Sequence, residues 1–172
     1  FLVSNQFYEH KNHIVVLKAI KLLKQENIKF QVIFSGKTED YRNPAFFSGL
    51  LQYIEKHKLE EYVQIVGLIP REEQLSMLVN SLAVIQPSKF EGWSTIIEDS
   101  KTLSHQVICS SLDVHQEQLG KDGFYFEPDS DTELAKLMRD FLDEKIIRKN
   151  LSETYDVRML TFARTFVNAF AK

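Results

Sequence analysis

Short β-rich runs alternate along the chain with longer segments in which apolar residues recur at helical spacing. In the first longer segment, Ile14, Leu17, Ile20 and Leu23 recur every three or four residues, which predicts a helix with one buried face. The runs with strand composition cover residues 1–4, 30–34, 62–66, 83–85, 107–109 and 123–126. Because strands that alternate with helices of this length form parallel sheets, the pattern predicts an α/β domain with about six strands and helices on both faces.

The ends of the predicted helices carry residues that usually start or stop a helix. Pro70 stands before the third helix, Ser94 or Thr95 can cap the fourth, and Gly120 follows the fifth. The predicted helices cover about residues 14–23, 46–54, 71–79, 95–103, 114–119 and 134–141. The remainder, about residues 145–172, is predicted as a C-terminal helical segment with an apolar stripe.

Composition and charge narrow the class of protein. A length of 172 residues and a hydrophobic fraction of 44% fit one globular domain, and a net charge of -3 does not favour nucleic acid or an anionic membrane as a partner. The single Cys109 excludes an internal disulfide, and His10, His13 and His105 have no metal-ligand spacing, so we expect no metal. No apolar run approaches the roughly 18 to 20 residues of a membrane span, which indicates a soluble protein. Because Phe1 opens directly as an apolar strand, we expect the chain to start within a larger protein.

The loop from Pro87 to Thr95 is the strongest candidate for a binding site. It follows a predicted strand and leads into a helix, so it lies at the carboxyl edge of the sheet, where ligands of open α/β sheets bind. Backbone N–H groups and the positive end of the helix can receive a phosphate there. Glu91 lies at the strand end and Asp99 in the helix, where carboxylates suit sugar hydroxyl groups better than the anion itself.

Each of these residues also has a simpler interpretation. Glu91 and Asp99 taken singly are most often surface acids, and a serine or threonine before a helix is usually an N-cap. Glu98 is either solvated or part of the same site, Lys11 is either a surface lysine or a phosphate ligand, and Trp93 is a core residue, an interdomain anchor or a ligand platform. Their joint occurrence favours a site.

The segment Phe90-Glu-Gly-Trp-Ser-Thr-Ile-Ile-Glu-Asp resembles the retaining, nucleotide-sugar-dependent glycosyltransferases of family 4, often called group 1. Their hallmark is Glu, seven residues, then Glu, and Glu91 with Asp99 has this spacing with aspartate as the second acid. Gly67 in Val-Gly-Leu-Ile-Pro, which falls at a donor-binding position, and the run Gln86-Pro-Ser match further stretches. The resemblance is to the C-terminal, Rossmann-like half of the two-domain GT-B fold. It implies that residues 1–172 form a nucleotide-sugar (donor) binding domain that lacks the N-terminal acceptor domain.

The resemblance implies which residues bind the donor diphosphate. Lys11 takes the place of the lysine that contacts the phosphates, together with the N–H groups near Ser94 and Thr95. The family commonly has an arginine at the position of Asn5, so the phosphate contact there is reduced to at most a neutral hydrogen bond. Lys11 must then supply most of the positive charge.

The resemblance assigns the remaining donor contacts to the segment that carries the two acids. Glu91, Gly92 and Trp93 meet the sugar, and Glu91 and Lys11 are the expected catalytic residues. Asp99 binds the ribose hydroxyl groups, and Glu98 lies beside it among the donor-binding positions.

The implied activity is transfer of a sugar from a nucleoside diphosphate sugar to a saccharide or glycolipid acceptor with retention, as in polysaccharide biosynthesis. The nucleotide sugar is a substrate, and no cofactor, metal or nucleic acid is expected. We expect a cytoplasmic protein whose missing N-terminal domain binds the acceptor and makes any contact with the inner face of the membrane. The alternatives are a non-catalytic nucleotide-binding module and a protein-interaction module of the same Rossmann-like fold.

Overall fold

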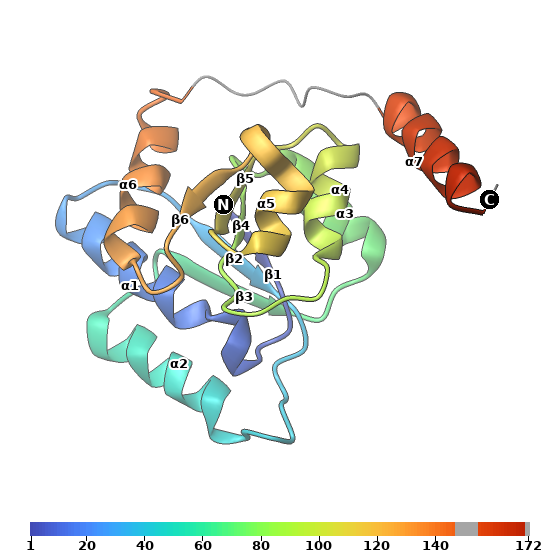
Figure 1. The fold of residues 1–172 in the computed structure, drawn as a ribbon. Helices are drawn as coiled ribbons and strands as arrows, with labels where there is room; N and C mark the ends of the chain where they lie inside the picture. Colours follow the sequence, from blue (N-terminus) through green and yellow to red (C-terminus); the bar gives the residue numbers. More distant parts are fainter. Residues whose placement is uncertain (147–154, 171–172) are drawn as a thin grey trace.

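The computed structural model describes residues 1–146 and 155–170 and contains one parallel sheet (Figure 1). The strands are β1 (Leu2–Ser4), β2 (Val32–Ser35), β3 (Val63–Gly67), β4 (Val84–Gln86), β5 (Val107–Ser110) and β6 (Phe124–Phe126). Their order is β3-β2-β1-β4-β5-β6, and every neighbouring pair is parallel. The predicted Rossmann-like sheet of six strands is confirmed.

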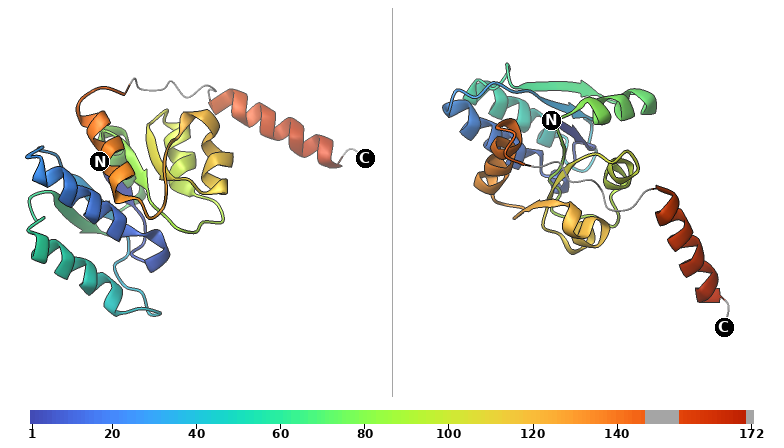
Figure 2. Two further views of the ribbon diagram at one scale, coloured as in Figure 1. Left: turned by 60° about the vertical axis from the view of Figure 1, so that its left-hand side comes forward. Right: turned by 90° about the horizontal axis from the view of Figure 1, so that it is seen from above.

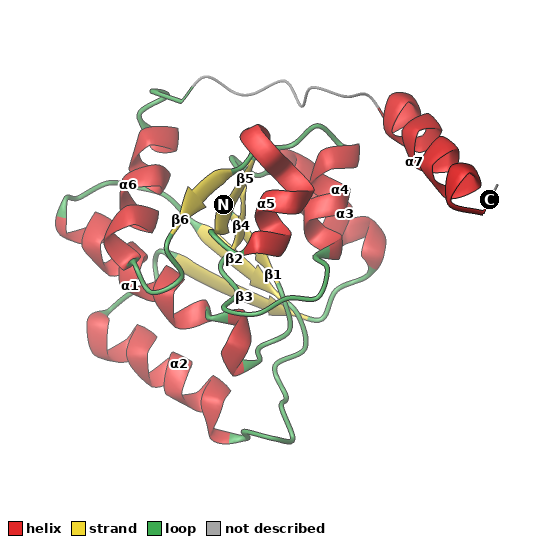
Figure 3. Cartoon of the chain, viewed as in Figure 1, coloured by secondary structure: helices red, strands yellow, loops and turns green. Residues whose placement is uncertain are grey.

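Helices connect the strands and cover both faces of the sheet (Figure 3). The α-helices are α1 (His13–Gln25), α2 (Ala45–His57), α3 (Arg71–Asn80), α4 (Thr95–Thr102), α5 (Asp113–Leu119), α6 (Asp131–Leu142) and α7 (Tyr155–Phe170). Two short 3-10 helices, η1 (Glu9–Lys11) and η2 (Gly120–Asp122), stand beside them. Helices α1, α2 and α6 lie on one face of the sheet, and α3, α4 and α5 lie on the other (Figures 1 and 2).

The alternation of side chains along the strands divides the core between these two faces. In β1, Val3 belongs to the large apolar cluster under α1 and α6, whereas its neighbour Leu2 packs with Leu78 of α3 and Ile96 of α4. This is the period of two expected of a strand buried on both faces. The central strands are therefore fixed from both sides, and polar groups at their carboxyl ends are held by a rigid frame.

The strand order reverses between β1 and β4, the two neighbouring strands at the centre of the sheet. From β1 the chain adds β2 and β3 on one side, then crosses back to β4 and adds β5 and β6 on the other side. A reversal of this kind leaves a crevice at the carboxyl ends of the two central strands, because the loops after them lead to opposite faces. The loop after β1 and the loop after β4 meet at this point.

The structure shifts some predicted boundaries. The second strand begins at Val32 and not at Phe30, because Phe30 packs edge-on against Phe1 and tilted against Tyr62 ahead of the hydrogen-bonded ladder. Ser94 is the N-cap residue of α4, but its side chain makes no capping hydrogen bond.

The predicted C-terminal segment, about residues 145–172, is described in part. Residues 155–170 form α7, and residues 147–154 and 171–172 lie outside the described residues. The ribbon of α7 stands apart from the rest of the domain (Figure 2). Its apolar side chains Phe166 and Phe170 are exposed. Among the helices of residues 1–146 and 155–170, none has the length and apolar character needed to cross a membrane.

Candidate functional site

Two loops are joined at the carboxyl edge of β1 and β4. The backbone N–H of Lys89 donates to the carbonyl of His10 at 2.8 Å, and Asn12 Nδ2 donates to the carbonyls of Pro87 at 3.0 Å and Pro128 at 2.7 Å. Asn12 is buried and adopts a left-handed conformation with φ 56°, which asparagine tolerates better than most residues. This single side chain fixes the start of α1 against the loop that leads to α4.

Lys11 and Glu91 form an ion pair across these two loops. Lys11 Nζ lies 2.6 Å from Glu91 Oε1, and the same oxygen accepts hydrogen bonds from Gln86 Nε2 at 2.6 Å and Ser88 Oγ at 2.7 Å. The Glu91 side chain is only 8% exposed, and its other oxygen accepts no hydrogen bond from the described residues. Three donors on one oxygen fix the carboxylate and leave the second oxygen for a ligand.

The position of Glu91 is anchored through Gln86 to β1. Asn5 Nδ2 donates to Gln86 Oε1 at 2.8 Å, so the amide of Gln86 is bonded at both of its ends. Asn5, Gln86 and Ser88 are all buried. The Asn5 amide, which we expected near the phosphates, is thus occupied inside the domain. It is connected to the site through Gln86, which donates to Glu91.

The second predicted acid, Asp99, pairs with a residue that the sequence analysis did not single out. Arg71 Nη2 lies 2.5 Å from Asp99 Oδ1, and this hydrogen bond raises the pKa of Arg71 above its ordinary value. Arg71 Nη1 also donates to Gln74 Oε1 at 2.7 Å, and Gln74 Nε2 donates to Ser4 Oγ at 2.6 Å. Asp99 Oδ2 is buried and has no hydrogen-bond partner among the described residues. An arginine at a helix N-terminus opposes the helix dipole, and this is the sequence signal that could have pointed to a carboxylate partner.

Gln118 of α5 binds both the backbone at the start of α4 and the side chain of Glu98. Gln118 Oε1 accepts from the Ser94 N–H at 3.1 Å, and Gln118 Nε2 donates to the Ser94 carbonyl at 3.0 Å and to Glu98 Oε1 at 2.8 Å. Lys101 also pairs with Glu98 at 3.2 Å. The N–H of Ser94, expected to be free for an anion, is therefore engaged. Thr95, the first helical residue, begins an α4 turn without a side-chain cap.

The remaining predicted positions lie along the same edge, with Gly92 and Trp93 exposed and Gly67 partly buried. Trp93 is 52% exposed, and a side chain added at Gly92 would meet no atom within 4 Å. Gly67 ends β3 with φ 71°, and its carbonyl accepts from the Gly36 N–H at 2.8 Å. A Cβ on Gly36 would lie 2.1 Å from the Asn5 carbonyl, so the backbones after β1 and β2 are in direct contact. Only glycine permits this approach.

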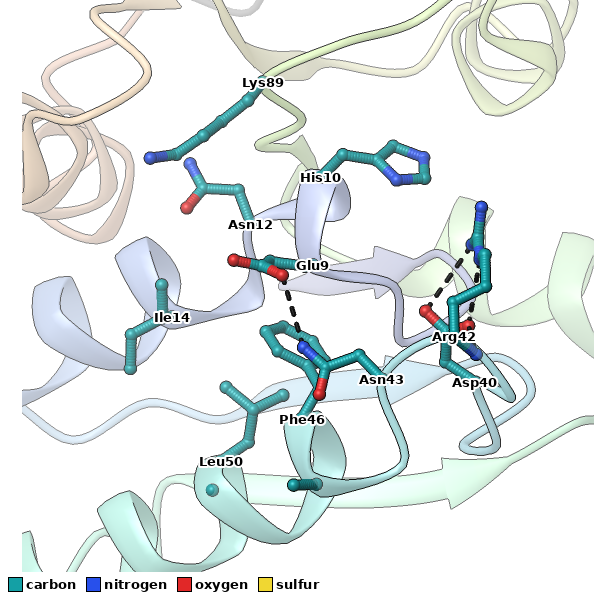
Figure 4. Close-up of a pocket in the computed structure, with 12 residues that line it drawn as sticks. Glu9, His10, Asn12, Ile14, Asp40, Arg42, Asn43, Phe46, Leu50 and Lys89 are labelled. Carbon is teal, nitrogen blue, oxygen red and sulfur yellow. Dashed lines mark hydrogen bonds and ion pairs between the residues drawn. The ribbon is translucent and has the colours of Figure 1, made fainter.

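A cavity of about 920 Å³ lies between η1 and the start of α2, and Lys89 of the loop after β4 also lines it (Figure 4). Its base is apolar and includes Ile14, Phe46 and Leu50. Its rim is polar, with Asn43 Nδ2 donating to Glu9 Oε2 at 3.2 Å. The sequence analysis predicted none of this cavity, because its wall is built by loops that meet only in the folded chain.

Residues 1–156 match the family model described as "Glycosyl transferases group 1". A comparison with curated proteins found no match. Among the matching solved structures, a glycosyltransferase from Rickettsia africae ESF-5 is 22% identical with a TM-score of 0.74 and covers 83% of this chain and 37% of its own. Sucrose-phosphate synthase from Thermosynechococcus elongatus is 16% identical with a TM-score of 0.78 and covers 99% and 45%. HepE from Anabaena, solved with UDP and glucose, is 15% identical with a TM-score of 0.80 and covers 100% and 48%. The chain spans less than half the length of each of these proteins, and the likeness establishes the fold.

Proposed function

Because the chain belongs to the group 1 glycosyltransferases, we propose that it supplies the donor-binding half of an enzyme that transfers a sugar from a nucleoside diphosphate sugar. The observation that carries the proposal is the Lys11–Glu91 pair at the crevice between β1 and β4, next to the N-terminus of α4. Structures of Anabaena HepE with UDP and with UDP-glucose support a donor of this class.

The diphosphate lies between Lys11 and the first turn of α4. When the bond between the sugar and the diphosphate breaks, negative charge grows on the leaving phosphate, and an ammonium group with helix N–H donors stabilises it where it grows. Glu91 holds Lys11 in place before the donor arrives, at 2.6 Å. Gln86 and Ser88 stay bonded to Glu91 when Lys11 turns toward phosphate, so the carboxylate keeps partners throughout.

The sugar lies against Glu91, Gly92 and Trp93. As the leaving group departs, positive character develops on the sugar ring, and a fixed carboxylate stabilises it. The second oxygen of Glu91 is available for this role because its three protein donors all use the first oxygen. Asp99, one helical turn into α4, binds the ribose hydroxyl groups.

The finer features of the reaction follow from the proposed place of the chain in the family. We infer a C-terminal domain of family 4 that transfers a hexose with retention to a saccharide or glycolipid acceptor, without a metal or cofactor. The acceptor binds a second, N-terminal domain, so residues 1–172 alone do not turn over. A cytoplasmic location, with membrane contact through the second domain, completes this proposal. Transfer by the purified 172-residue chain at a rate close to that of the full-length protein would contradict the division of labour.

Replacement of Glu91 by glutamine in the full-length protein tests the proposal. We expect sugar transfer to fall by about 10²- to 10³-fold, because a group that stabilises transition-state charge is lost, while nucleotide affinity changes little. Glu117→Gln, an exposed acid of α5, is the matched control and should transfer at the wild-type rate. A non-catalytic nucleotide-binding module would show no transfer in the wild type and the same nucleotide affinity in both variants. A protein-interaction module would show no response to nucleotide.

A further inference from the structure

Arg71 reaches Asp99 from the opening of a neighbouring helix and is bound at two points. It donates to Asp99 Oδ1 at 2.5 Å and to Gln74 Oε1 at 2.7 Å, and Gln74 is itself bonded to Ser4 at the carboxyl end of β1. We propose that Arg71 is a donor-binding residue that, together with Asp99, recognises the ribose diol of the nucleotide. This inference rests on the proposed function and names a contact within the same site.

The position of the pair places it on the nucleoside side of the donor. Asp99 follows the first residue of α4 by four positions, which is about 6 Å along a helix axis. With the phosphates at the N-terminus of α4, a distance of about 6 Å further along reaches the ribose and not a second phosphate. Arg71 contacts Asp99 at this depth, while Lys11 is paired with Glu91 in the loop before α4. The two cations therefore serve different parts of one ligand.

The hydrogen-bonding capacity of the pair matches a diol. A guanidinium carries five N–H donors, and the two bonds to Asp99 and Gln74 leave donors without an acceptor among the described residues. The Arg71 side chain is 54% exposed, so these donors are accessible. Each hydroxyl of a ribose both donates and accepts. It can donate to the carboxylate of Asp99 and accept from the guanidinium of Arg71, which neither residue could satisfy alone.

The unpartnered oxygen of Asp99 gives a second indication of a ligand. Asp99 Oδ2 is buried and bonded to no described residue, although a buried carboxylate oxygen ordinarily has a partner. A ribose hydroxyl that enters between Arg71 and α4 supplies that hydrogen bond. Arg71 also compensates for the shorter side chain of Asp99, which is one methylene shorter than a glutamate at this position. The guanidinium bonded to Asp99 adds N–H donors that can reach the ribose.

Nucleotide affinity in the full-length protein tests this inference. We expect Arg71→Ala to weaken binding of UDP or GDP, whichever the wild type binds, by about ten- to hundredfold, since hydrogen bonds to a charged group are lost. For the matching 2′-deoxynucleotide, the affinity of Arg71→Ala should be close to the affinity of the wild type for that same ligand, because the ligand lacks one hydroxyl of the diol. Binding of inorganic pyrophosphate should not change. Arg71→Lys should recover only part of the affinity, because an ammonium lacks the planar fork.

Arg42→Ala is the matched control. Arg42 pairs with Asp40 at 3.0 Å outside the proposed donor site, and its side chain is 51% exposed, close to that of Arg71. Unchanged ribonucleotide affinity in Arg71→Ala would overturn the inference and leave the proposed function intact. Tighter ribonucleotide binding would overturn it too, because Arg71 would then compete with the ribose for the carboxylate of Asp99. An equal loss for the 2′-deoxynucleotide would also overturn it. Absence of nucleotide binding by the wild type would instead contradict the proposed function, and the inference with it.

Discussion

Replacement of Gln86 by leucine tests whether a buried amide holds the proposed catalytic carboxylate. The change removes the bond from Gln86 Nε2 to Glu91 at 2.6 Å and the bond from Asn5 Nδ2 to Gln86 Oε1 at 2.8 Å. A hydrogen bond to a charged group contributes about 1.5–3 kcal/mol, and the amide of Asn5, left buried without a partner, costs about 1–3 kcal/mol. Burial of the leucine side chain offsets part of this loss. We expect the free energy of unfolding to fall by about 2–4 kcal/mol.

Urea denaturation followed by circular dichroism measures this change, and thermal unfolding provides an independent check. For a domain of this size, about 2–4 kcal/mol lowers the unfolding temperature by roughly 5–15 °C. Asn5→Leu alone leaves Gln86 Oε1 without its hydrogen-bond donor. The double variant Asn5→Leu with Gln86→Leu leaves neither amide group unpaired, so it should be more stable than the sum of the single effects by about 1–3 kcal/mol. Additivity of the two changes within about 0.5 kcal/mol would refute the network.

Three further predictions concern packing, pH and ligand contact. Gly36→Ala should lower the free energy of unfolding by at least about 2 kcal/mol, because the new Cβ would lie 2.1 Å from the Asn5 carbonyl and the φ of this residue is 143°. Gly49→Ala in α2, where a Cβ meets no atom within 4 Å, is the control and should leave the unfolding temperature unchanged or raise it. Burial lowers the pKa of His13 to about 3, below its value in the unfolded chain, so its contribution to stability falls as the pH falls below about 6.5. Between pH 7 and pH 5 this loss is about 2 kcal/mol, and urea denaturation of His13→Phe should lack it; the same pH slope in both proteins would contradict the assignment. Trp93 is the only tryptophan of the 172-residue chain and is 52% exposed, so the fluorescence of this chain should change on nucleotide binding and saturate with the affinity that calorimetry gives. Constant emission at saturation would remove Trp93 from the donor site.

The sequence predicted the sheet because local patterns decide it. The short apolar run at residues 83–85 and the helical spacing of Ile14, Leu17 and Ile20 each indicate which residues of one element are buried. The folded chain packs these residues into its core. The approximate location of the site was also predictable, because the loops at the carboxyl ends of strands follow from the element order.

The partners within the site were not predictable, because they come from segments far apart in the chain. The bonds from Asn5 to Gln86 and from Arg71 to Asp99 join positions 81 and 28 residues apart, and no periodicity encodes them. Gln118, which occupies the Ser94 N–H, comes from a separate helix and reads in sequence as an ordinary surface glutamine. Side-chain partners of this kind depend on the packing of whole elements.

The most direct test of the central claim is the response of the backbone amide signals of the 172-residue chain to millimolar UDP or GDP, followed by NMR spectroscopy. This measurement detects weak binding and locates it residue by residue. The account predicts shifts at Lys11, through the loop and first turn of α4, and at Asp99, with no change in α6. Shifts confined to the cavity beside α2, or none with either nucleotide, would contradict a donor site between Lys11 and Asp99.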